Sequence, residues 1–405
     1  IFTTLGLMSD IPNRARVVII GGGVIGTSVA YHLGHLGWSD VVLLERDRLT
    51  SGTTWHAAGL MTCFGSMSET SMSMRQYTRE LYRRLEAETG QSTGFRPVGF
   101  VEAAADEGRL EEYRRVAAFN RHVGLDVQEI SPAEIAELFP FAETSDLLAG
   151  FYVPQDGRVN PVDATMALAK GARMQGVQLV EGVSVERVLT QGGRVAGVAT
   201  SQGDIECEYV VNCAGMWARQ LGERNGVVIP LQAAEHYYLI TEPIEGVDPA
   251  WPVFEDPSRH GYYREEGGGL MVGLFEPVCA PWNVDGIPED FSFGEITPDW
   301  DRMGPYVERA MQPSAIITTL KSLKLDLPGF RLSAPAANGL SACSKTDLDN
   351  QACPGVWNTD PDGVDGVGED VGGVCTKQHD PRCSISSGSK LLIPQITPST
   401  KVLCS

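Results

Sequence analysis

Apolar residues gather in short runs near the start of the chain. Residues 16–20 form a run rich in β-branched side chains that ends in three glycines, which is typical of a buried parallel strand leading into a turn. Residues 24–36 carry a helical pattern that ends at Gly37, and residues 40–44 form a second apolar run that leads into Glu45. This order predicts a βαβ unit, and therefore an α/β protein with a parallel sheet.

Further periodic segments follow along most of the chain. Helices are predicted at residues 71–89, 107–122, 132–138 and 161–175. Strands are predicted at residues 177–180, 183–188, 195–200, 205–211, 234–241 and 270–275. From about residue 313 the periodic segments give way to Ser, Gly, Pro, Asp and Asn. We expect residues 313–405 to be irregular or disordered and to form no core of their own.

Composition narrows the class of protein. The formal net charge of −20 disfavours binding to nucleic acid or to anionic lipid. No apolar run approaches the ~20 residues that a membrane span needs, and residues 1–7 lack the features of a signal peptide. The nine cysteines include no C-x-x-C pair, which fits a reducing compartment. We expect a protein of the cytoplasm or the mitochondrial matrix.

Metal binding is not predicted. Asp360, Asp362 and Asp365 are spaced as in a calcium loop, but Val364 stands where an oxygen ligand is needed and no glutamate completes the loop. An ordinary acidic linker is the favoured interpretation of this segment.

The glycine turn at the start of the chain predicts a dinucleotide site. Gly21, Gly23 and Gly26 have the spacing that permits a tight turn, close approach of the backbone to a pyrophosphate, and close packing of helix on strand. The helix that follows presents free N–H groups and a partial positive charge to phosphates. Glu45, at the end of the second strand, is placed to accept hydrogen bonds from a ribose. These features alone do not distinguish NAD from FAD.

Two later segments favour FAD. Residues 50–60 are rich in small and hydroxyl side chains, so the backbone can pass close to a flat cofactor while hydroxyls reach the phosphates. Residues 209–213 form an apolar strand that ends in Ala214 and Gly215, which can pack near the diphosphate.

The segment around His56 resembles the flavin-attachment motif of the dimethylglycine and sarcosine dehydrogenase family. The matching residues are Gly52, Thr53, Thr54, Trp55, His56, Ala57, Ala58, Gly59 and Leu60. Similar stretches lie at residues 82–90, 151–157, 211–218 and 299–300, so the resemblance covers about residues 14–312. In that family the histidine is bonded to the 8α carbon of the flavin. The resemblance also implies that Val24, Ile25, Glu45, Arg46 and Val185 lie around FAD.

The resemblance implies a fold and its division into domains. A Rossmann-type FAD-binding domain of the glutathione-reductase type would be interleaved with an antiparallel-sheet substrate domain, as in D-amino-acid oxidases. The FAD-binding parts are expected at about residues 14–66 and 150–222, and the substrate-domain parts at about residues 67–149 and 223–312. Residues 313–405 show no counterpart of the family's last flavin-domain strand and glycine-rich loop, so the enzyme unit is expected to be truncated there.

The resemblance also implies a reaction, the oxidative N-demethylation of an N-methylated glycine such as dimethylglycine or sarcosine. A hydride would pass from the N-methyl carbon to flavin N5, and the resulting iminium would hydrolyse to formaldehyde. His236 and Tyr238 alternate on one predicted strand and are candidate hydrogen-bonding residues over the ring. Arg264 is a candidate clamp for the substrate carboxylate, although the adjacent glutamates could neutralise it.

Two other functions remain open at this point. One is a catalytically silent regulatory subunit with a flavoprotein fold, which the truncation favours. A regulatory subunit of this kind lacks the histidine, so His56 argues against it. The other is a D-amino-acid-oxidase-like enzyme with non-covalent FAD, which the Trp55-His56 motif disfavours. An electron-transfer flavoprotein is a possible partner of the dehydrogenase.

Overall fold

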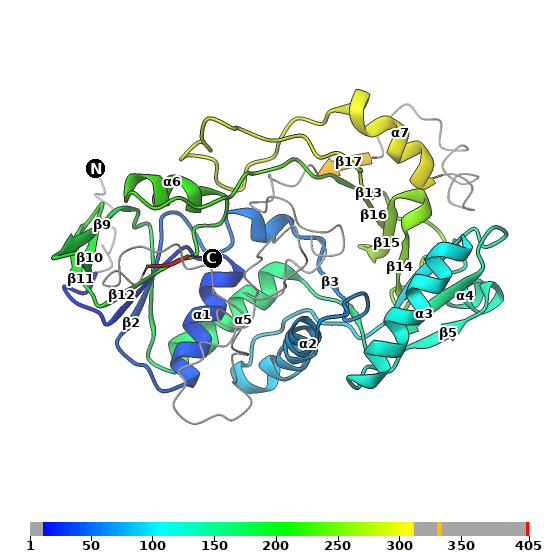
Figure 1. The fold of residues 1–405 in the computed structure, drawn as a ribbon, viewed down its shortest axis with the longest axis horizontal. Coiled ribbons are helices and arrows are strands. Elements are labelled where there is room, and N and C mark those ends of the chain that lie inside the picture. Colours follow the sequence, from blue (N-terminus) through cyan, green and yellow to red (C-terminus); the bar gives the residue numbers. More distant parts are fainter. Residues whose placement is uncertain (1–10, 312–329, 334–401, 405) are drawn as a thin grey trace, which may run out of the picture.

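The structure, a computed structural model, describes residues 11–311, 330–333 and 402–404. Five parallel strands form one sheet in the order β18-β12-β1-β2-β8. Their bounds are β1 Val17–Ile20, β2 Val41–Glu45, β8 Gln178–Glu181, β12 Tyr209–Asn212 and β18 Val402–Cys404. Helices α1 (Val24–His35) and α5 (Pro161–Met174) pack together beside this sheet (Figure 1). The predicted βαβ unit is confirmed to within one residue at each boundary.

Alternation along β1 shows why both faces of this sheet are covered. Val17 and Ile19 belong to the cluster that contains side chains of α1 and α5, whereas Val18 and Ile20 belong to a second cluster. The second cluster includes Val198 of a small antiparallel sheet. The strands of that sheet are β9 Val185–Gln191, β10 Arg194–Thr200 and β11 Gly203–Glu206.

The single strand predicted over residues 205–211 is wrong. Its first part belongs to β11, which pairs antiparallel with β10, and its second part belongs to β12, which pairs parallel with β1. The apolar pattern runs through both parts because Ile205 of β11 and the last three residues of β12 are buried, but the two parts belong to different sheets.

A larger sheet of eight strands has the order β17-β13-β16-β15-β14-β4-β6-β5. Every neighbouring pair is antiparallel except β14 with β4. The strands are β4 Phe100–Ala104, β5 Gln128–Ile130, β6 Ala149–Val153, β13 Tyr238–Thr241, β14 Val253–Asp256, β15 Gly261–Glu266, β16 Gly269–Leu274 and β17 Phe330–Ser333. The strand predicted at residues 234–241 is therefore shorter than expected, since it begins only at Tyr238.

The remaining helices connect and cover the two sheets. They are α2 Glu69–Thr89, α3 Glu107–His122, α4 Pro132–Leu138, α6 Ala218–Arg224 and α7 Trp300–Met311. Ser68 caps α2, so this helix begins two residues before the predicted start, whereas α3 and α4 have their predicted bounds. The short elements are η1 Thr53–His56, β3 Leu60–Met61, β7 Gly157–Arg158, η2 Gly215–Trp217 and η3 Pro257–Arg259.

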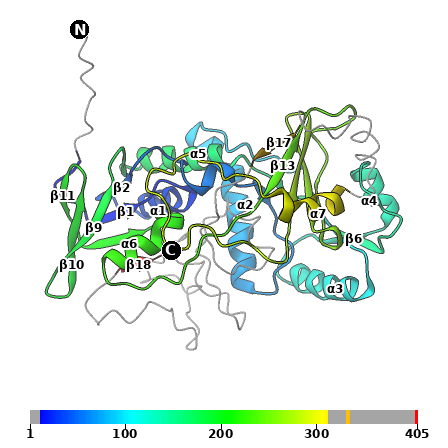
Figure 2. The same cartoon turned by 90° about the horizontal axis from the view of Figure 1, so that it is seen from above.

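Seen from above, α2 lies between the small sheet at one end of the molecule and α3 and α4 at the other (Figure 2). The strands of the two large sheets come from alternating stretches of the chain, as the resemblance implies. The domain boundaries given above remain predictions. Among the described residues, no helix is long and apolar enough to cross a membrane.

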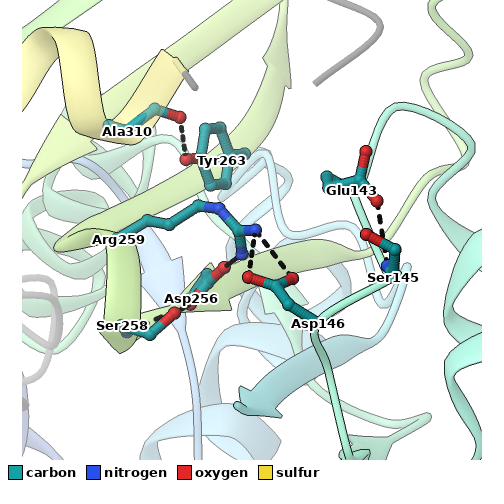
Figure 3. A network of polar contacts seen from close by, with 8 residues as sticks. All are labelled: Glu143, Ser145, Asp146, Asp256, Ser258, Arg259, Tyr263 and Ala310. Atoms are coloured by element: carbon teal, nitrogen blue, oxygen red, sulfur yellow. Dashed lines mark hydrogen bonds and ion pairs between the residues drawn. The ribbon is translucent and has the colours of Figure 1, made fainter. Parts of the chain in front are cut away.

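A polar network fixes α7 to the larger sheet (Figure 3). Arg259 forms ion pairs with Asp256 and, at 2.8 Å, with Asp146. The hydroxyl of Tyr263 donates a hydrogen bond to the carbonyl of Ala310 in α7. Because Arg259 and Asp256 are largely buried, we assign this network a structural role on the face that α4 and α7 cover.

Two stretches of residues 313–405 differ from the expectation of an irregular tail. Strand β17 pairs with β13, and strand β18 pairs with β12 at the edge of the parallel sheet. Both sheets thus receive a strand from a region that carries no periodic apolar pattern. The rest of this region, including the aspartates of the excluded calcium loop, lies outside the described residues.

Candidate functional site

A cavity of about 350 Å³ lies where the carboxyl ends of β1, β2 and β12 meet. This edge of a parallel sheet is where ligands bind in doubly wound folds. Twelve residues that the sequence assigned to the cofactor line the cavity. They are Gly21, Gly23, Val24, Ile25, Glu45, Arg46, Gly52, Thr53, Thr54, Val185, Ala214 and Gly215. Their contacts with FAD remain predictions.

The glycine turn has the close contacts that its spacing predicts. Gly21 has a φ of +109°, and a Cβ there would lie 2.2 Å from the carbonyl oxygen of Cys213. A Cβ on Gly26 would lie 1.9 Å from the carbonyl oxygen of Gly21, so helix and strand touch there. Gly23 is less crowded, since its Cβ would meet only Thr54 Oγ1, at 3.0 Å. Gly21 and Gly26 are therefore required by the fold, and Gly23 faces the cavity.

The carboxylate of Glu45 connects the end of β2 to this turn. Its Oε2 accepts a 2.6 Å hydrogen bond from the N–H of Gly22, and its Oε1 accepts one of 2.9 Å from the N–H of Asp47. Burial raises the pKa of Glu45, while these two N–H groups oppose the shift. Each carboxylate oxygen has a second lone pair, so Glu45 can hold the turn and still accept hydrogen bonds from a ribose.

Helix η1 brings a second segment against the turn. Thr54 Oγ1 accepts a 3.0 Å hydrogen bond from the N–H of Val24, the first residue of α1. Thr50 lies two residues before Gly52, the N-cap of η1, and has a φ of 74°. A β-branched residue in this conformation is strained, and such strain collects at functional sites.

Trp217 forms a wall of the cavity that sequence reasoning missed. The guanidinium of Arg46 lies 3.9 Å from the centroid of its ring, and a Cβ on Gly52 would lie 3.3 Å from the same ring. Its Nε1 donates a 2.9 Å hydrogen bond to the carbonyl of Pro288. Two sequence signals pointed to it: its place just after the small residues that follow β12, and its position within the stretch 211–218 that resembles the family. Other lining residues that were missed include Gly22, Ser184, Gln220, Arg224, Leu231 and Glu289.

The cavity stops short of the predicted attachment residue. His56 is the last residue of η1 and is only 1% exposed. Its Nε2 donates a 2.8 Å hydrogen bond to the carbonyl of Gly294. The neutral ring then carries no proton on Nδ1, which is buried and has no hydrogen-bond partner in the described part of the chain. Burial lowers the pKa of His56 to about 4, so the ring is neutral at physiological pH.

A segment far along the chain covers His56 and its neighbour. The ring of Trp55 packs edge-on against Phe293, and its Nε1 is also buried without a partner among the described residues. Phe293 has a φ of 46°, and its N–H donates to the carbonyl of Ser51 at 2.8 Å. The centroids of the Trp55 and His56 rings are 3.6 Å apart, so two adjacent rings at the closed end of the site each carry a buried polar atom without a partner among the described residues.

The rest of the motif is used in backbone packing. A Cβ on Gly59 would lie 2.2 Å from the carbonyl of Val159, and Leu60 pairs with Arg158 between β3 and β7. Ala57 and Ala58 are buried, at 8% and 9% exposed. None of Trp55, His56, Ala57, Ala58, Gly59 and Leu60 is among the residues that line the cavity, nor is Gly26.

Arg264 reaches this closed end from the larger sheet. Its Nε donates a 2.6 Å hydrogen bond to the carbonyl of Ala58, and its guanidinium forms a 2.6 Å ion pair with Glu266. Glu265, the other candidate to neutralise it, pairs with Arg158 instead. A substrate carboxylate would therefore share Arg264 with Glu266.

Tyr238 lies in the same neighbourhood. Burial raises its pKa to about 12, an effect that Arg264 opposes and that Glu266 and Glu295 reinforce. Glu295 directly follows Gly294, the residue whose carbonyl contacts His56. The structure thus brings Tyr238, Arg264 and the attachment motif together, although they are far apart in sequence.

His236 lies beside this group but not on the strand that the sequence predicted. It precedes β13 and is 6% exposed, with its ring stacked on that of Phe275 at 6.5 Å between centroids. Its Nδ1 lies 3.4 Å from Oε2 of Glu276. The prediction that His236 and Tyr238 alternate along one strand is therefore wrong, because the strand begins at Tyr238.

The residues present fit a flavin dinucleotide. The glycine turn, the N-terminus of α1 and Glu45 form a cradle for a diphosphate and a ribose, and Gly23 leaves space that a Cβ would fill. At the other end, the unprotonated Nδ1 of His56 lies buried in a neutral ring. A nitrogen of this kind has a lone pair available for a bond to carbon.

Comparisons with known proteins agree with this geometry. The model of the FAD dependent oxidoreductase family matches residues 16–314. The chain is 39% identical to human (Homo sapiens) sarcosine dehydrogenase over 78% of its length and 35% of that protein. It is 38% identical to the 4-methylaminobutanoate oxidase (formaldehyde-forming) of Paenarthrobacter nicotinovorans over 78% of its length and 38% of that protein. It is 39% identical to the mouse (Mus musculus) pyruvate dehydrogenase phosphatase regulatory subunit over 78% of its length and 36% of that protein.

The chain thus spans about a third of the length of these relatives. Among solved structures, L-proline dehydrogenase from P. horikoshii matches with a TM-score of 0.67 and 23% identity, over 76% of this chain and 79% of that one. Glycine oxidase from Geobacillus kaustophilus matches with a TM-score of 0.62 and 23% identity, over 81% of this chain and 85% of that one. The predicted D-amino-acid-oxidase-like fold is confirmed.

Proposed function

We propose that this chain, which belongs to the family of FAD dependent oxidoreductases, oxidises an N-methylated glycine such as sarcosine or dimethylglycine and carries its FAD covalently on His56. One observation carries the proposal. Helix η1 lines a dinucleotide cavity with its first residues and ends in a buried, neutral histidine whose Nδ1 has no partner in the described part of the chain. An ordinary structural histidine would satisfy both ring nitrogens.

Different residues of the chain would bind different parts of the cofactor. The turn from Gly21 to Ile25 and the η1 threonines would hold the diphosphate, and Glu45 would accept from the ribose. His56 would fix the flavin ring at the closed end. When bound, FAD would supply the hydride acceptor for the N-methyl carbon of the substrate, and the resulting iminium would take up water and release formaldehyde and the demethylated amine.

Residues on and beside the larger sheet would orient the substrate. The raised pKa of Tyr238, about 12, keeps its hydroxyl protonated at neutral pH, so it can donate a hydrogen bond. Arg264 would bind the substrate carboxylate, which would replace Glu266 as its ion-pair partner. His236 would accept the proton of the amine. These groups are buried, and their burial would exclude water from the reacting carbon.

The names of the relatives support the substrate class. Sarcosine dehydrogenase, dimethylglycine dehydrogenase and 4-methylaminobutanoate oxidase all name an N-methylated amino acid. Several of these relatives are named as mitochondrial, which supports the matrix as the location. An electron-transfer flavoprotein is the acceptor that we propose.

A regulatory function is the second candidate, because one relative of equal similarity is named as a phosphatase regulatory subunit. His56 separates the two functions, since a protein that only regulates has no use for a covalent flavin. A D-amino-acid-oxidase-like enzyme with reversibly bound FAD is the third.

Flavin fluorescence after acid precipitation and denaturing electrophoresis tests the proposal. Wild-type protein should retain fluorescence, should reduce a dye acceptor with sarcosine or dimethylglycine, and should release formaldehyde. Retained flavin without amine oxidation would contradict the substrate class. Flavin that acid releases completely would favour the third candidate, and a protein that takes up no flavin would favour the regulatory one.

A further inference from the structure

Glu276 is an unusual carboxylate in this molecule. It follows the end of β16, is 3% exposed, and neither of its oxygens has a hydrogen-bond partner among the described residues. A buried carboxylate without hydrogen bonds is costly, and such groups are commonly retained for function.

Nitrogen atoms of two side chains, His236 and Arg302, lie near the Glu276 carboxylate. Nδ1 of His236 lies 3.4 Å from Oε2 of Glu276, and a guanidinium nitrogen of Arg302 lies 3.7 Å from Oε1. Both of these nitrogens are themselves buried and without a hydrogen-bond partner in the described part of the chain. The three side chains form a cluster in which each of these nitrogen–oxygen distances is a few tenths of an ångström too long for a hydrogen bond.

Arg302 also forms ion pairs with two other carboxylates. It forms a 2.5 Å ion pair with Glu235 and a 3.3 Å ion pair with Asp299. Three carboxylates thus surround one guanidinium, so the cluster carries an excess of negative charge. Glu276 is the least well paired of the three, so a proton on the ring of His236 would stabilise its negative charge most.

The cluster spans the larger sheet from one face to the other. Tyr237 and Leu274 pack with α7 in one core cluster, whereas Tyr238 and Phe275 belong to the other. The ring of His236 stacks on Phe275, which places it on the side of Tyr238. Tyr238 and Arg264 lie on one face of the sheet. Glu276 and Arg302 of α7 thus contact the cluster around His236 from the other face.

We infer that Glu276, backed by Arg302, is a positioning residue that holds the proton of His236 on Nδ1 and leaves Nε2 as the acceptor nitrogen. A carboxylate can only accept, so the facing ring nitrogen must be the donor. This inference rests on the proposed function for the use of Nε2. There the N–H bond of the substrate ammonium breaks, its proton binds to Nε2, and the electron pair stays on the amine nitrogen. Glu276 stabilises the imidazolium, and the proton leaves to solvent with the product.

The tautomer can be measured directly. In protein labelled with ¹⁵N-histidine, the two ring nitrogens of His236 are identified by the signals that vanish in His236→Gln. Wild-type protein should show a protonated Nδ1 and an unprotonated Nε2 at neutral pH. In Glu276→Gln the amide can donate to Nδ1, so the proton should move to Nε2, and Glu276→Asp should restore the wild-type pattern.

Glu235→Gln is the matched control, because the Glu235 side chain pairs with Arg302 while Nδ1 of His236 faces Glu276. It should keep the wild-type tautomer. With amine substrate, Glu276→Gln should lower kcat by about a hundredfold and change KM little, while Glu235→Gln stays near wild type. A wild-type His236 with its proton on Nε2, or one whose tautomer is the same in Glu276→Gln, would overturn the inference. The tautomer is read without turnover, so an inactive protein with the expected tautomer would instead count against the proposed function. If Glu276→Gln does not fold, the wild-type and Glu276→Asp spectra still decide.

Discussion

The two ends of the candidate cofactor site are built in opposite ways. At the nucleotide end, most of the predicted lining residues come from the first βαβ unit and the loop after it, and Glu45 and Thr54 both have hydrogen-bond partners. At the ring end, residues from four distant segments pack closely, and Trp55 and His56 each keep a buried polar atom without a partner in the described part of the chain. A preformed backbone cradle suits reversible recognition of phosphates, whereas a buried, unsatisfied nitrogen suits the formation of one specific bond.

Removing the imidazole should have the largest effect, since it eliminates the proposed bond. His56→Ala should abolish acid-resistant flavin while reversible FAD binding through the cradle persists, and amine oxidation should fall by at least about tenfold. Mass mapping of the peptide that contains Trp55 and His56 measures the adduct. His35→Ala, at an exposed histidine of α1, is the control and should keep all its flavin. An adduct that survives in His56→Ala would place the bond elsewhere.

Blocking the cradle should have the next largest effect. Gly23→Val fills the space in front of the turn, so FAD uptake should fall by about a hundredfold or more while the fold persists. Gly26→Ala is the contrasting variant, because its Cβ would lie 1.9 Å from a backbone oxygen and should prevent folding. Flavin absorbance per protein and thermal unfolding distinguish the two results. Wild-type flavin content in Gly23→Val would contradict the assignment of the cradle.

The pH dependence of stability should report on the ring end. The folded pKa of His56 is about 4, and burial is its main cause. An unfolded histidine titrates near about 6.5, so the unfolded chain binds more protons between these values. Stability is therefore lost as pH falls from about 6.5 through about 4, by about 3 kcal/mol for this residue.

Denaturant unfolding of flavin-free protein at the two ends of that pH range measures this loss. His56→Gln should lose about 3 kcal/mol less than wild type, and His35→Gln should match wild type. Glu45 at the other end works in the opposite direction, because its raised pKa means that stability is lost as pH rises. An equal loss in wild type and His56→Gln would show that His56 is not held neutral.

The smallest expected effect is at the carboxylate that holds the turn. Glu45→Gln places a donor where the N–H of Gly22 also donates, so the free energy of unfolding should fall by about 1–2 kcal/mol. FAD affinity should fall by about tenfold, with the acid-resistant fraction unchanged once the flavin is bound. Titration with FAD and thermal unfolding measure the two changes. An unchanged affinity would remove Glu45 from the site.

The sequence by itself determined the nucleotide end. Gly21, Gly26 and Glu45 lie within a single βαβ unit, where strand, turn and helix follow from local pattern and from the space that glycine leaves. The twelve predicted residues that line the cavity come mostly from this unit and from the loop after it. The resemblance singled out His56, because one buried histidine carries no pattern of its own.

Only the tertiary structure decided the rest. The hydrogen bond between His56 and Gly294 joins residues 238 positions apart, and the contact of Glu276 with His236 has no local signal in the sequence. Trp217 lies in a stretch that resembles the family, but only the structure places it on the wall of the cavity. Strands β17 and β18 likewise enter their sheets from a stretch without apolar periodicity. The physical reason is that a periodic pattern shows which face of an element is buried but not which distant element covers it. The choice of partner depends on packing and charge across the whole chain, and at the ring end that choice makes the site.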